Sequence, residues 1–473
     1  MSTTQEGKEQ KDCCWFDALT TPLNACSLET YFPIPRNDDI NSRSDTPSAV
    51  PLVVGCYQLN ESSQQLDSED ADAADSSSAG SSRCGELRLH MIPSPCTSKS
   101  DMKFGDAAVL QMESGVLDGK WKRRIKSSNQ SEETVSQSAQ IPLFASACAS
   151  GSIHIHGLQK NKSTDSTTNN NTSSWSLNHL ASSEGQSDTG LCLALAWNDY
   201  IHENDDQIVS SYSKGEVAIH QVSYGNTIDA PKLKETHRWN AHTLFGCPSE
   251  VWTCSFLRGA ENVILSGADD VSIFNYIICL VYENNQSQHV FSSHHCFFLF
   301  NYNYNQCYMK VWDSRQTQRP VHKVGNTEFD AGVTAISSHP SLDNIFAVGS
   351  YDEHVRLYDY RKMDEPLSKV SVGGGVWRIK WHPSTWSGGC RESSSCRGKL
   401  LVAAMHGGCR VVDFPSLNGG QKEYSTEEAC ILSEFTAHES MAYGADWISF
   451  GSPELEAAAS CSFYDRKAFI WDG

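Results

Sequence analysis

A repeated pattern of short strands, best seen in residues 348–383, restricts the fold of this chain more than any other feature. Residues 346–349 are apolar and small, residues 351–354 are polar, and Val355, Leu357 and Tyr358 resume an extended apolar pattern. This order predicts two strands joined by a tight turn. The ending Leu-Tyr-Asp is a variant of the Trp-Asp dipeptide that closes the third strand of a propeller blade. A new strand then begins near Val376, so one period of a repeat is visible here.

The same pattern recurs along the chain and predicts about seven blades. The first strand of each blade is expected at 25–32, 115–121, 191–197, 251–256, 332–339, 375–382 and 443–447. We therefore expect an all-β fold, a seven-bladed WD-repeat β-propeller over residues 25–473 with long disordered loop inserts. Residues 1–24 form a separate N-terminal segment. Its apolar patch, 14–19, is a candidate for the strand that completes the last blade, because the chain ends directly after Trp471-Asp472.

Four inserts interrupt the repeat. The segments 62–82, 160–189 and 384–398 are polar and rich in small residues, and we expect them to be disordered. The fourth, 271–306, is apolar and aromatic, yet its apolar runs are shorter than the ~20 residues of a membrane span. Without it, residues 266–270 join 307–313 and align without a gap to residues 348–359. We hypothesise a translated, unspliced intron, because Val271-Ser272 can be encoded by the donor sequence GTAAGT and Gln306 by the acceptor CAG.

Composition excludes several classes of function. The 473 residues carry a net charge of −20, whereas nucleic-acid binding needs a basic surface. The 18 cysteines include no CxxC pair at zinc spacing, and His294-His295-Cys296 lacks partner ligands, so no metal site is expected. The N-terminus has no apolar signal-peptide region. We expect a cytoplasmic, monomeric protein with reduced thiols, no membrane segment and no cofactor.

Three aspartates stand at the same offset before the closing Asp of a blade. They are Asp270, Asp352 and Asp465. Paired catalytic acids are one interpretation. The favoured one is structural, because an Asp at such a turn bonds backbone groups or a histidine of its blade.

Four motifs in the later blades are more specific than the repeat itself. They are Gly-Ser-Tyr-Asp-Glu-His at 349–354, Gly-Gly-Val-Trp-Arg-Ile-Lys-Trp-His-Pro at 374–383, Ala-Ala-Met-His-Gly-Gly at 403–408 and Tyr-Gly-Ala-Asp-Trp at 443–447. In this order they closely resemble the diphthine methyl ester hydrolase family of WD-repeat proteins, whose members also bear the name diphthine methyltransferase. The resemblance covers the third to seventh blades well and the first two weakly.

The resemblance implies an enzyme of diphthamide biosynthesis, a protein modification of a histidine in translation elongation factor 2. It implies a carboxylic ester hydrolase (a methylesterase) that removes the methyl ester of methylated diphthine and leaves diphthine for the final amidation. Elongation factor 2 is then the protein substrate, docked on the propeller.

Ester hydrolysis needs a base and donors for the oxyanion, and the four motifs supply candidates. His406 or His354 can act as base, with Glu353 or Asp446 to orient it, and Arg378 can meet the oxyanion. The candidates for substrate binding are Tyr351, Trp377 and Tyr443.

A second hypothesis is a non-enzymatic WD-repeat adaptor, such as the substrate receptor of a ubiquitin ligase. Propellers often serve only as binding platforms. The pairs Asp313-Arg315 and Asp359-Arg361 fit such docking loosely, although Asp-x-Arg endings are frequent in this fold. An adaptor would bind its partner without chemistry.

Overall fold

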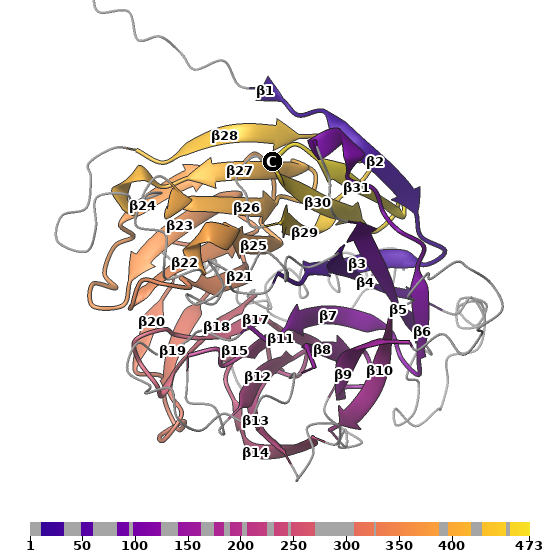
Figure 1. Ribbon diagram of the computed structural model, residues 1–473. Helices are drawn as coiled ribbons and strands as arrows, with labels where there is room; N and C mark the ends of the chain where they lie inside the picture. The colour runs from indigo at the N-terminus through magenta and orange to yellow at the C-terminus, as the bar shows by residue number, and fades with distance from the viewer. Residues whose placement is uncertain are drawn as a thin grey trace, which may run out of the picture.

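The chain forms a closed ring of seven small β-sheets around a central axis (Figure 1). The computed structural model describes residues 11–32, 49–59, 83–93, 98–123, 141–161, 175–183, 190–200, 206–224, 231–244, 247–269, 307–325, 328–386, 396–417, 428–450 and 455–473. Five sheets have four antiparallel strands in chain order, the sheet of the sixth blade has a fifth strand from the N-terminal segment, and the sheet of the seventh blade is completed by another N-terminal strand. The expected seven-bladed, all-β propeller is confirmed.

The first four blades follow one another along the chain. Their strands, from the centre outward, are β3 (Asn24–Thr30), β4 (Ala49–Leu59), β5 (Arg83–Pro93) and β6 (Ala108–Met112); β7 (Val116–Trp121), β8 (Leu143–Cys148), β9 (Ile153–Lys160) and β10 (Trp175–Ser182); β11 (Cys192–Trp197), β12 (Gln207–Tyr212), β13 (Glu216–Ser223) and β14 (Lys232–Asn240); β17 (Val251–Phe256), β18 (Val263–Ala268), β19 (Met309–Asp313) and β20 (His322–Val324). A two-stranded ribbon, β15 (Thr243–Leu244) and β16 (Cys247–Pro248), precedes the fourth blade.

The last three blades complete the ring. Their strands are β21 (Val333–Ser338), β22 (Ile345–Ser350), β23 (His354–Asp359) and β24 (Ser368–Ser371); β25 (Arg378–Trp381), β26 (Lys399–Ala403), β27 (Cys409–Asp413) and β28 (Cys430–Phe435); β29 (Ala442–Ser449), β30 (Glu456–Ser462) and β31 (Lys467–Trp471). Short 3-10 turns η3 (Lys99–Asp101), η5 (Pro383–Thr385) and η7 (Pro415–Leu417) lie in the connections.

An N-terminal strand closes the ring. Strand β2 (Trp15–Thr20) pairs antiparallel with β31, from Trp15 opposite Trp471 to Thr20 opposite Lys467. Phe16 and Leu19 pack against the apolar layer between the seventh and first blades. A shorter strand, β1 (Lys11–Asp12), runs parallel to the outer edge of β28. Both pairings satisfy strand edges that would otherwise be open to water.

The hydrophobic core lies between neighbouring blades. Small and aliphatic side chains of one blade pack on aromatic side chains of the next, as Ala347 and Leu357 pack with Trp381 and Phe414. A buried polar contact recurs within blades: the indole of Trp471 donates to Ser460 Oγ at 3.1 Å, and the ring of His438 bonds the same hydroxyl at 2.8 Å. The fourth blade repeats this arrangement with Trp312, Ser266 and His242.

Two of the three turn aspartates have the structural contacts expected of them. Asp352 accepts the amide of His354 at 3.1 Å and forms an ion pair with Arg356 at 2.8 Å. Asp465 accepts the amides of Glu439 and Lys467 at 2.9 and 2.8 Å. Asp270 lies outside the described residues.

The inserts are covered only in part. Residues 62–82 and 271–306 lie outside the described residues, as do most of 384–398. The expected insert 160–189 differs from the structure, because strand β10 occupies Trp175–Ser182 and pairs with β9. Polar side chains alternate with Trp175 and Leu177 there, as suits an outer strand with one face in water.

The strands that flank the segment 271–306 pair in the same register as the following blade. Val263 opposes Asp313 and Gly267 opposes Met309, just as Ile345 opposes Asp359 and Gly349 opposes Val355. The gapless alignment of the two blades in sequence is therefore matched by their strand pairing.

Candidate functional site

In four of the seven blades, an inner-strand residue that lines the central channel stands immediately before a tryptophan. The indole of that aromatic residue donates to the carbonyl of the equivalent residue in the preceding blade. The pairs are Trp121 with Glu29 (3.3 Å), Trp197 with Lys120 (3.0 Å), Trp381 with Ser337 (3.2 Å) and Trp447 with Lys380 (3.2 Å). This ring of indole hydrogen bonds fixes how far each inner strand extends along the channel.

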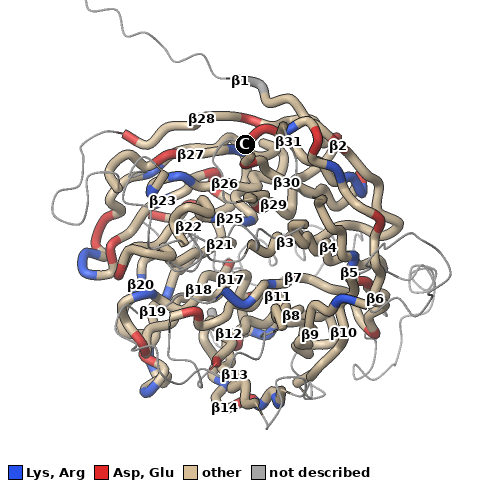
Figure 2. Tube along the Cα trace, viewed as in Figure 1, with Lys and Arg blue, Asp and Glu red and all other residues tan. Residues whose placement is uncertain are grey.

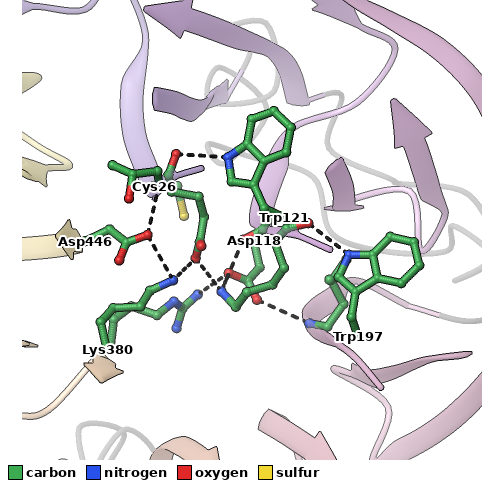
Figure 3. A network of polar contacts seen from close by, with 12 residues as sticks. Cys26, Asp118, Trp121, Trp197, Lys380 and Asp446 are labelled. Atoms are coloured by element: carbon green, nitrogen blue, oxygen red, sulfur yellow. Dashed lines mark hydrogen bonds and ion pairs between the residues drawn. The ribbon is translucent and has the colours of Figure 1, made fainter. Parts of the chain in front are cut away.

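Charged side chains meet across the channel from four blades (Figure 3). Lys120 of β7 bonds Glu29 of β3 and Asp118 of its own strand, each at 2.9 Å. Lys380 of β25 forms an ion pair with the same Glu29 and lies 3.8 Å from Asp446 of β29. Glu29 is therefore shared by two lysines from opposite sides of the channel.

Two arginines extend this network toward its ends. Arg378 Nη2 lies 3.5 Å from Asp118 Oδ1, and Arg123 Nη2 lies 3.5 Å from Asp446 Oδ2. Arg123 also lies 3.9 Å from the ring centroid of Phe32. We call Glu29, Asp118, Lys120, Arg123, Arg378, Lys380 and Asp446 the channel network. The network contains four cations and three carboxylates, so it carries one excess positive charge although the whole chain is acidic. Figure 2 shows the basic positions of β25 near the centre of the ring.

Burial and charge shift the pKa values in the channel. Burial alone would raise the pKa of Asp118, but Lys120 and Arg378 hold it below its usual value. Burial lowers the pKa of Lys380 despite Asp446 and Glu29. Loss of solvent raises the pKa of Asp199 to about 8, although the backbone N–H and the charge of Arg123 act to lower it. Such shifts in a cleft are typical of functional sites, and of structural ion pairs as well.

A cavity of about 130 Å³ lies within this network. Its wall includes all seven residues of the channel network, together with Asp199, Tyr200, Trp377 and Trp386. The volume is below the ~300–1,000 Å³ of clefts that hold whole small-molecule ligands. The cavity therefore suits a single side chain or a group of that size.

The four sequence motifs converge at one mouth of the channel. The ring of Trp377 lies 6.1 Å from Tyr351, 5.1 Å from Tyr443 and 5.7 Å from Trp252, between ring centroids. These four half-buried rings come from four consecutive blades. We call them the aromatic mouth.

Glycines allow this convergence. A Cβ on Gly374 would lie 2.1 Å from the carbonyl oxygen of Ala404 and 2.6 Å from the amide of Gly407, so no other residue fits. A Cβ on Gly375 would press on Tyr351 at 3.2 Å. The Gly-rich motif therefore packs directly on the Ala-Ala-Met-His-Gly-Gly turn and under the tyrosine of the blade before it.

Five of the residues predicted from sequence are brought to this part of the molecule. Tyr351, Trp377 and Tyr443 form the mouth. Arg378 connects the mouth to the channel network, because its guanidinium lies 5.2 Å from the Trp377 ring and reaches Asp118. Asp446 is buried in the network, where its carboxylate accepts the amides of Thr30 and Trp447 at 2.9 Å each.

Of the other three candidates, Glu353 and His406 lie on turns between the middle strands of blades, and His354 is the first residue of β23. The Nδ1–H of His354 donates to the carbonyl of Asp352 at 2.7 Å. Glu353 and His406 are exposed, and Glu353 has a φ of 68°. Among the described contacts, neither histidine is oriented by Asp446, whose oxygens are engaged elsewhere. Their catalytic roles remain predictions.

Sequence reasoning did not single out Glu29, Asp118, Lys120, Lys380 or Trp252. The sequence did contain a signal for channel residues, because the residue before an inner-strand tryptophan lines the channel. The four dipeptides are Lys120-Trp121, Ala196-Trp197, Lys380-Trp381 and Asp446-Trp447. Charged residues at three of these four positions indicate a polar channel.

The structure defines a seven-bladed propeller whose central channel is charged and whose mouth is aromatic. A chain in the crystal structure of a mitotic checkpoint complex is similar at a TM-score of 0.50 and 12% identity, covering 100% of this chain and 98% of that one, which shows the fold alone. No family model matches the chain.

Curated relatives are more informative than the fold. The chain is 30% identical over 293 residues to the diphthine methyltransferase homolog of Dictyostelium discoideum, covering 59% of this chain and 62% of that protein. It is 30% identical over 257 residues to the human diphthine methyltransferase, covering 54% of this chain and 43% of that protein. The matches thus span about half the length of these relatives. The resemblance indicated by the four motifs is confirmed, and the adaptor alternative is not favoured.

The expected reaction, hydrolysis of a methyl ester by a carboxylic ester hydrolase, is contradicted by these names. The relatives are named for methyl transfer to diphthine, which is the opposite direction. The four motifs indicated the resemblance, but they contain no residue pattern that decides the direction of a reaction.

Neither a membrane-spanning helix nor a metal-binding cluster is found among the described residues. No helix there is long and apolar enough to cross a membrane. In the same part of the chain, no group of three or more His, Cys, Asp or Glu side chains is placed to hold a metal ion.

Proposed function

We propose that this chain acts in diphthamide biosynthesis, on the diphthine residue of a protein substrate, in the methyl-transfer step for which its relatives are named. The observation that carries the proposal is the match to relatives named diphthine methyltransferase. Translation elongation factor 2 is the proposed substrate protein, and the cytoplasm the proposed location.

The geometry of the channel supports a docked side chain. Four motifs meet at the mouth, and the cavity below has room for one extended side chain rather than for a large free ligand. Arg378 lies between the aromatic mouth and the cavity, and its guanidinium can pair with a carboxylate. The proposed roles are therefore contact with the modified side chain by Tyr351, Trp377 and Tyr443, and pairing with its carboxylate by Arg378.

A methyltransferase also requires a methyl donor. A nucleoside-sized donor does not fit the described cavity, because about 130 Å³ is too small and its charged walls are already ion-paired.

The test uses human cells from which the diphthine methyltransferase relative has been deleted. The chain is expressed there, and the mass of the modified histidine peptide of elongation factor 2 is measured. We expect a mass change of one methyl group with the wild-type chain and a loss of at least about tenfold with Arg378→Leu, as when one preorganised charged contact is removed. Arg378→Lys should retain part of the effect.

Arg315→Ala combined with Arg361→Ala is the matched control. Both guanidiniums are exposed, and each bonds the aspartate two residues earlier at 2.6 Å. This variant should behave as wild type. An unchanged peptide mass with folded wild-type chain would overturn the proposal, and loss of function in the double arginine variant would favour the adaptor.

A further inference from the structure

The end of the channel opposite the aromatic mouth holds a buried arginine. Three rings of the mouth lie at the starts of inner strands, whereas Arg123 comes after the end of β7. Its side chain is 9% exposed, and its guanidinium carbon lies 3.9 Å from the ring centroid of Phe32 and 5.0 Å from that of Trp386. Rings that cover the faces of a guanidinium leave its edge to donate hydrogen bonds. We call this region the far end of the channel.

The hydrogen-bonding capacity of Arg123 is not filled by the described residues. Its Nη2 lies 3.3 Å from the carbonyl oxygen of Thr30 and 3.5 Å from Asp446 Oδ2, and the second distance exceeds the ~2.7–2.9 Å of a close ion pair. Its Nη1 is buried and has no hydrogen-bond partner among the described residues. Because arginine keeps its proton in proteins, this cation stays charged although burial without a close partner is costly.

Asp446 is shared by two cations and neutralises neither fully. Its Oδ2 lies 3.5 Å from Arg123 Nη2 and 3.8 Å from Lys380 Nζ, and the same oxygen already accepts a backbone amide at 2.9 Å. Burial lowers the pKa of Lys380; Asp446 and Glu29 act to raise it, and the charges of Lys120 and Arg123 lower it again. Positive charge is therefore in excess at this point of the channel network.

The other carboxyl groups near Arg123 do not cancel this excess. Asp199 accepts the backbone N–H of Arg123 at 2.9 Å, and loss of solvent raises its pKa to about 8, so it is mainly protonated at pH 7. Asp206 is ion-paired with Lys122. The far end of the channel therefore carries net positive charge at neutral pH.

We propose that Arg123 and Lys380 bind a small oxyanion, a phosphate or a carboxylate group, at the far end of the channel. Both residues line the cavity, whose volume of about 130 Å³ admits a group of that size. The guanidinium edge supplies a fork of N–H donors, and the ammonium group supplies a point charge. The inference goes beyond the proposed function, because its ligand is a free anion at the end of the channel opposite the aromatic mouth.

The test uses the full chain and two free anions. Inorganic phosphate and acetate are titrated separately at pH 7 by isothermal titration calorimetry, with sodium chloride in excess to hold the ionic strength constant. Because chloride is always present, a site that accepts any anion gives no signal. We expect one oxyanion per chain, with phosphate bound more tightly than acetate because its charge is larger.

Variants with opposite expected effects locate the site. Arg123→Gln should weaken phosphate binding at least about tenfold, as for the loss of one hydrogen bond to a charged group. Asp446→Asn removes the carboxylate that competes for both cations, so it should tighten binding by about tenfold. Arg315→Ala is the matched control, because this guanidinium is exposed and bonds Asp313, and it should change nothing.

Two results would overturn the inference. One is the absence of saturable binding of either oxyanion to the wild-type chain. The other is phosphate binding that stays unchanged in both the Arg123→Gln and the Asp446→Asn variants, with folding judged by circular dichroism. Where Arg123→Gln does not fold, Asp446→Asn decides alone, and binding that is not tightened in that variant overturns the inference.

Discussion

On four inner strands, the residue before a tryptophan contributes to the character of the channel. Because the following tryptophan is locked by its indole hydrogen bond to the preceding blade, the residue before it must face the axis. Lysine at this position in β7 and β25 and aspartate in β29 make the channel ionic, whereas alanine in β11 leaves room for the cavity. The cluster persists because each carboxylate has at least one cation within 4 Å, which offsets its desolvation.

Asp199 differs from the carboxylates of the channel network, and its substitution tests whether loss of solvent controls the charge of a carboxyl group in the channel. Loss of solvent raises its pKa to about 8, from a usual value near 4. Between those two pH values the folded state holds a proton that the unfolded state has lost. Stability therefore falls as pH rises through this window, by up to about 1.4 kcal/mol per pH unit, and levels off above pH ~8.

In Asp199→Asn this slope should disappear, while the amide oxygen can still accept the N–H of Arg123 that now bonds the carboxylate at 2.9 Å. The free energy of unfolding is measured by urea denaturation from pH 5 to pH 9 for both proteins. Parallel pH profiles for wild type and variant would show that Asp199 is ionised in the folded protein.

At the scale of elements, the sequence predicted inner strands far better than outer ones. The expected strands 191–197, 251–256 and 443–447 agree with β11, β17 and β29 within a few residues. Inner strands are buried on both faces and therefore appear as apolar runs. Strand β14 alternates exposed and partly buried residues, Lys-Leu-Lys-Glu-Thr-His-Arg, so nothing but its pairing with β13 marks it as a strand.

Strand β2 is an outer strand whose contribution can be measured by truncation. It covers the edge of β31, and its Asp17 accepts the amide of Phe104 at 2.8 Å, which ties it to the first blade. Removing residues 1–20 should lower the free energy of unfolding by about 2–4 kcal/mol, from lost burial of Phe16 and Leu19.

Removing residues 1–10 is the control for that truncation, since it leaves β2 whole and should have little effect. Chemical denaturation and limited proteolysis compare the two. Equal stability of both truncated proteins would mean that the ring stays closed without β2.

At the scale of the whole molecule, ring closure creates contacts that no sequence spacing reveals. Glu29 and Lys380 pair although 351 residues separate them, and Thr30 bonds Asp446 across 416 residues. Motifs with local character were therefore predictable: Tyr351, Trp377, Tyr443 and Arg378 were found from their own neighbours. Glu29 and Asp118 were not, because their role depends on partners from distant blades.

Blade four offers the last test, because a 36-residue segment, 271–306, enters its hairpin between strands that keep the register of blade five. Deleting this segment joins Asp270 to Cys307 and should leave the melting temperature unchanged or higher. It should also raise the fraction of monomer in size-exclusion chromatography, because the segment is rich in apolar and aromatic residues.

Deleting residues 62–82, a polar insert between β4 and β5, separates the effect of shortening a hairpin from that of removing apolar side chains, and should leave the monomer fraction as it is. A melting temperature lower by more than about 5 °C after deletion of 271–306 would show instead that this segment supports the propeller, and would contradict its interpretation as an unspliced intron.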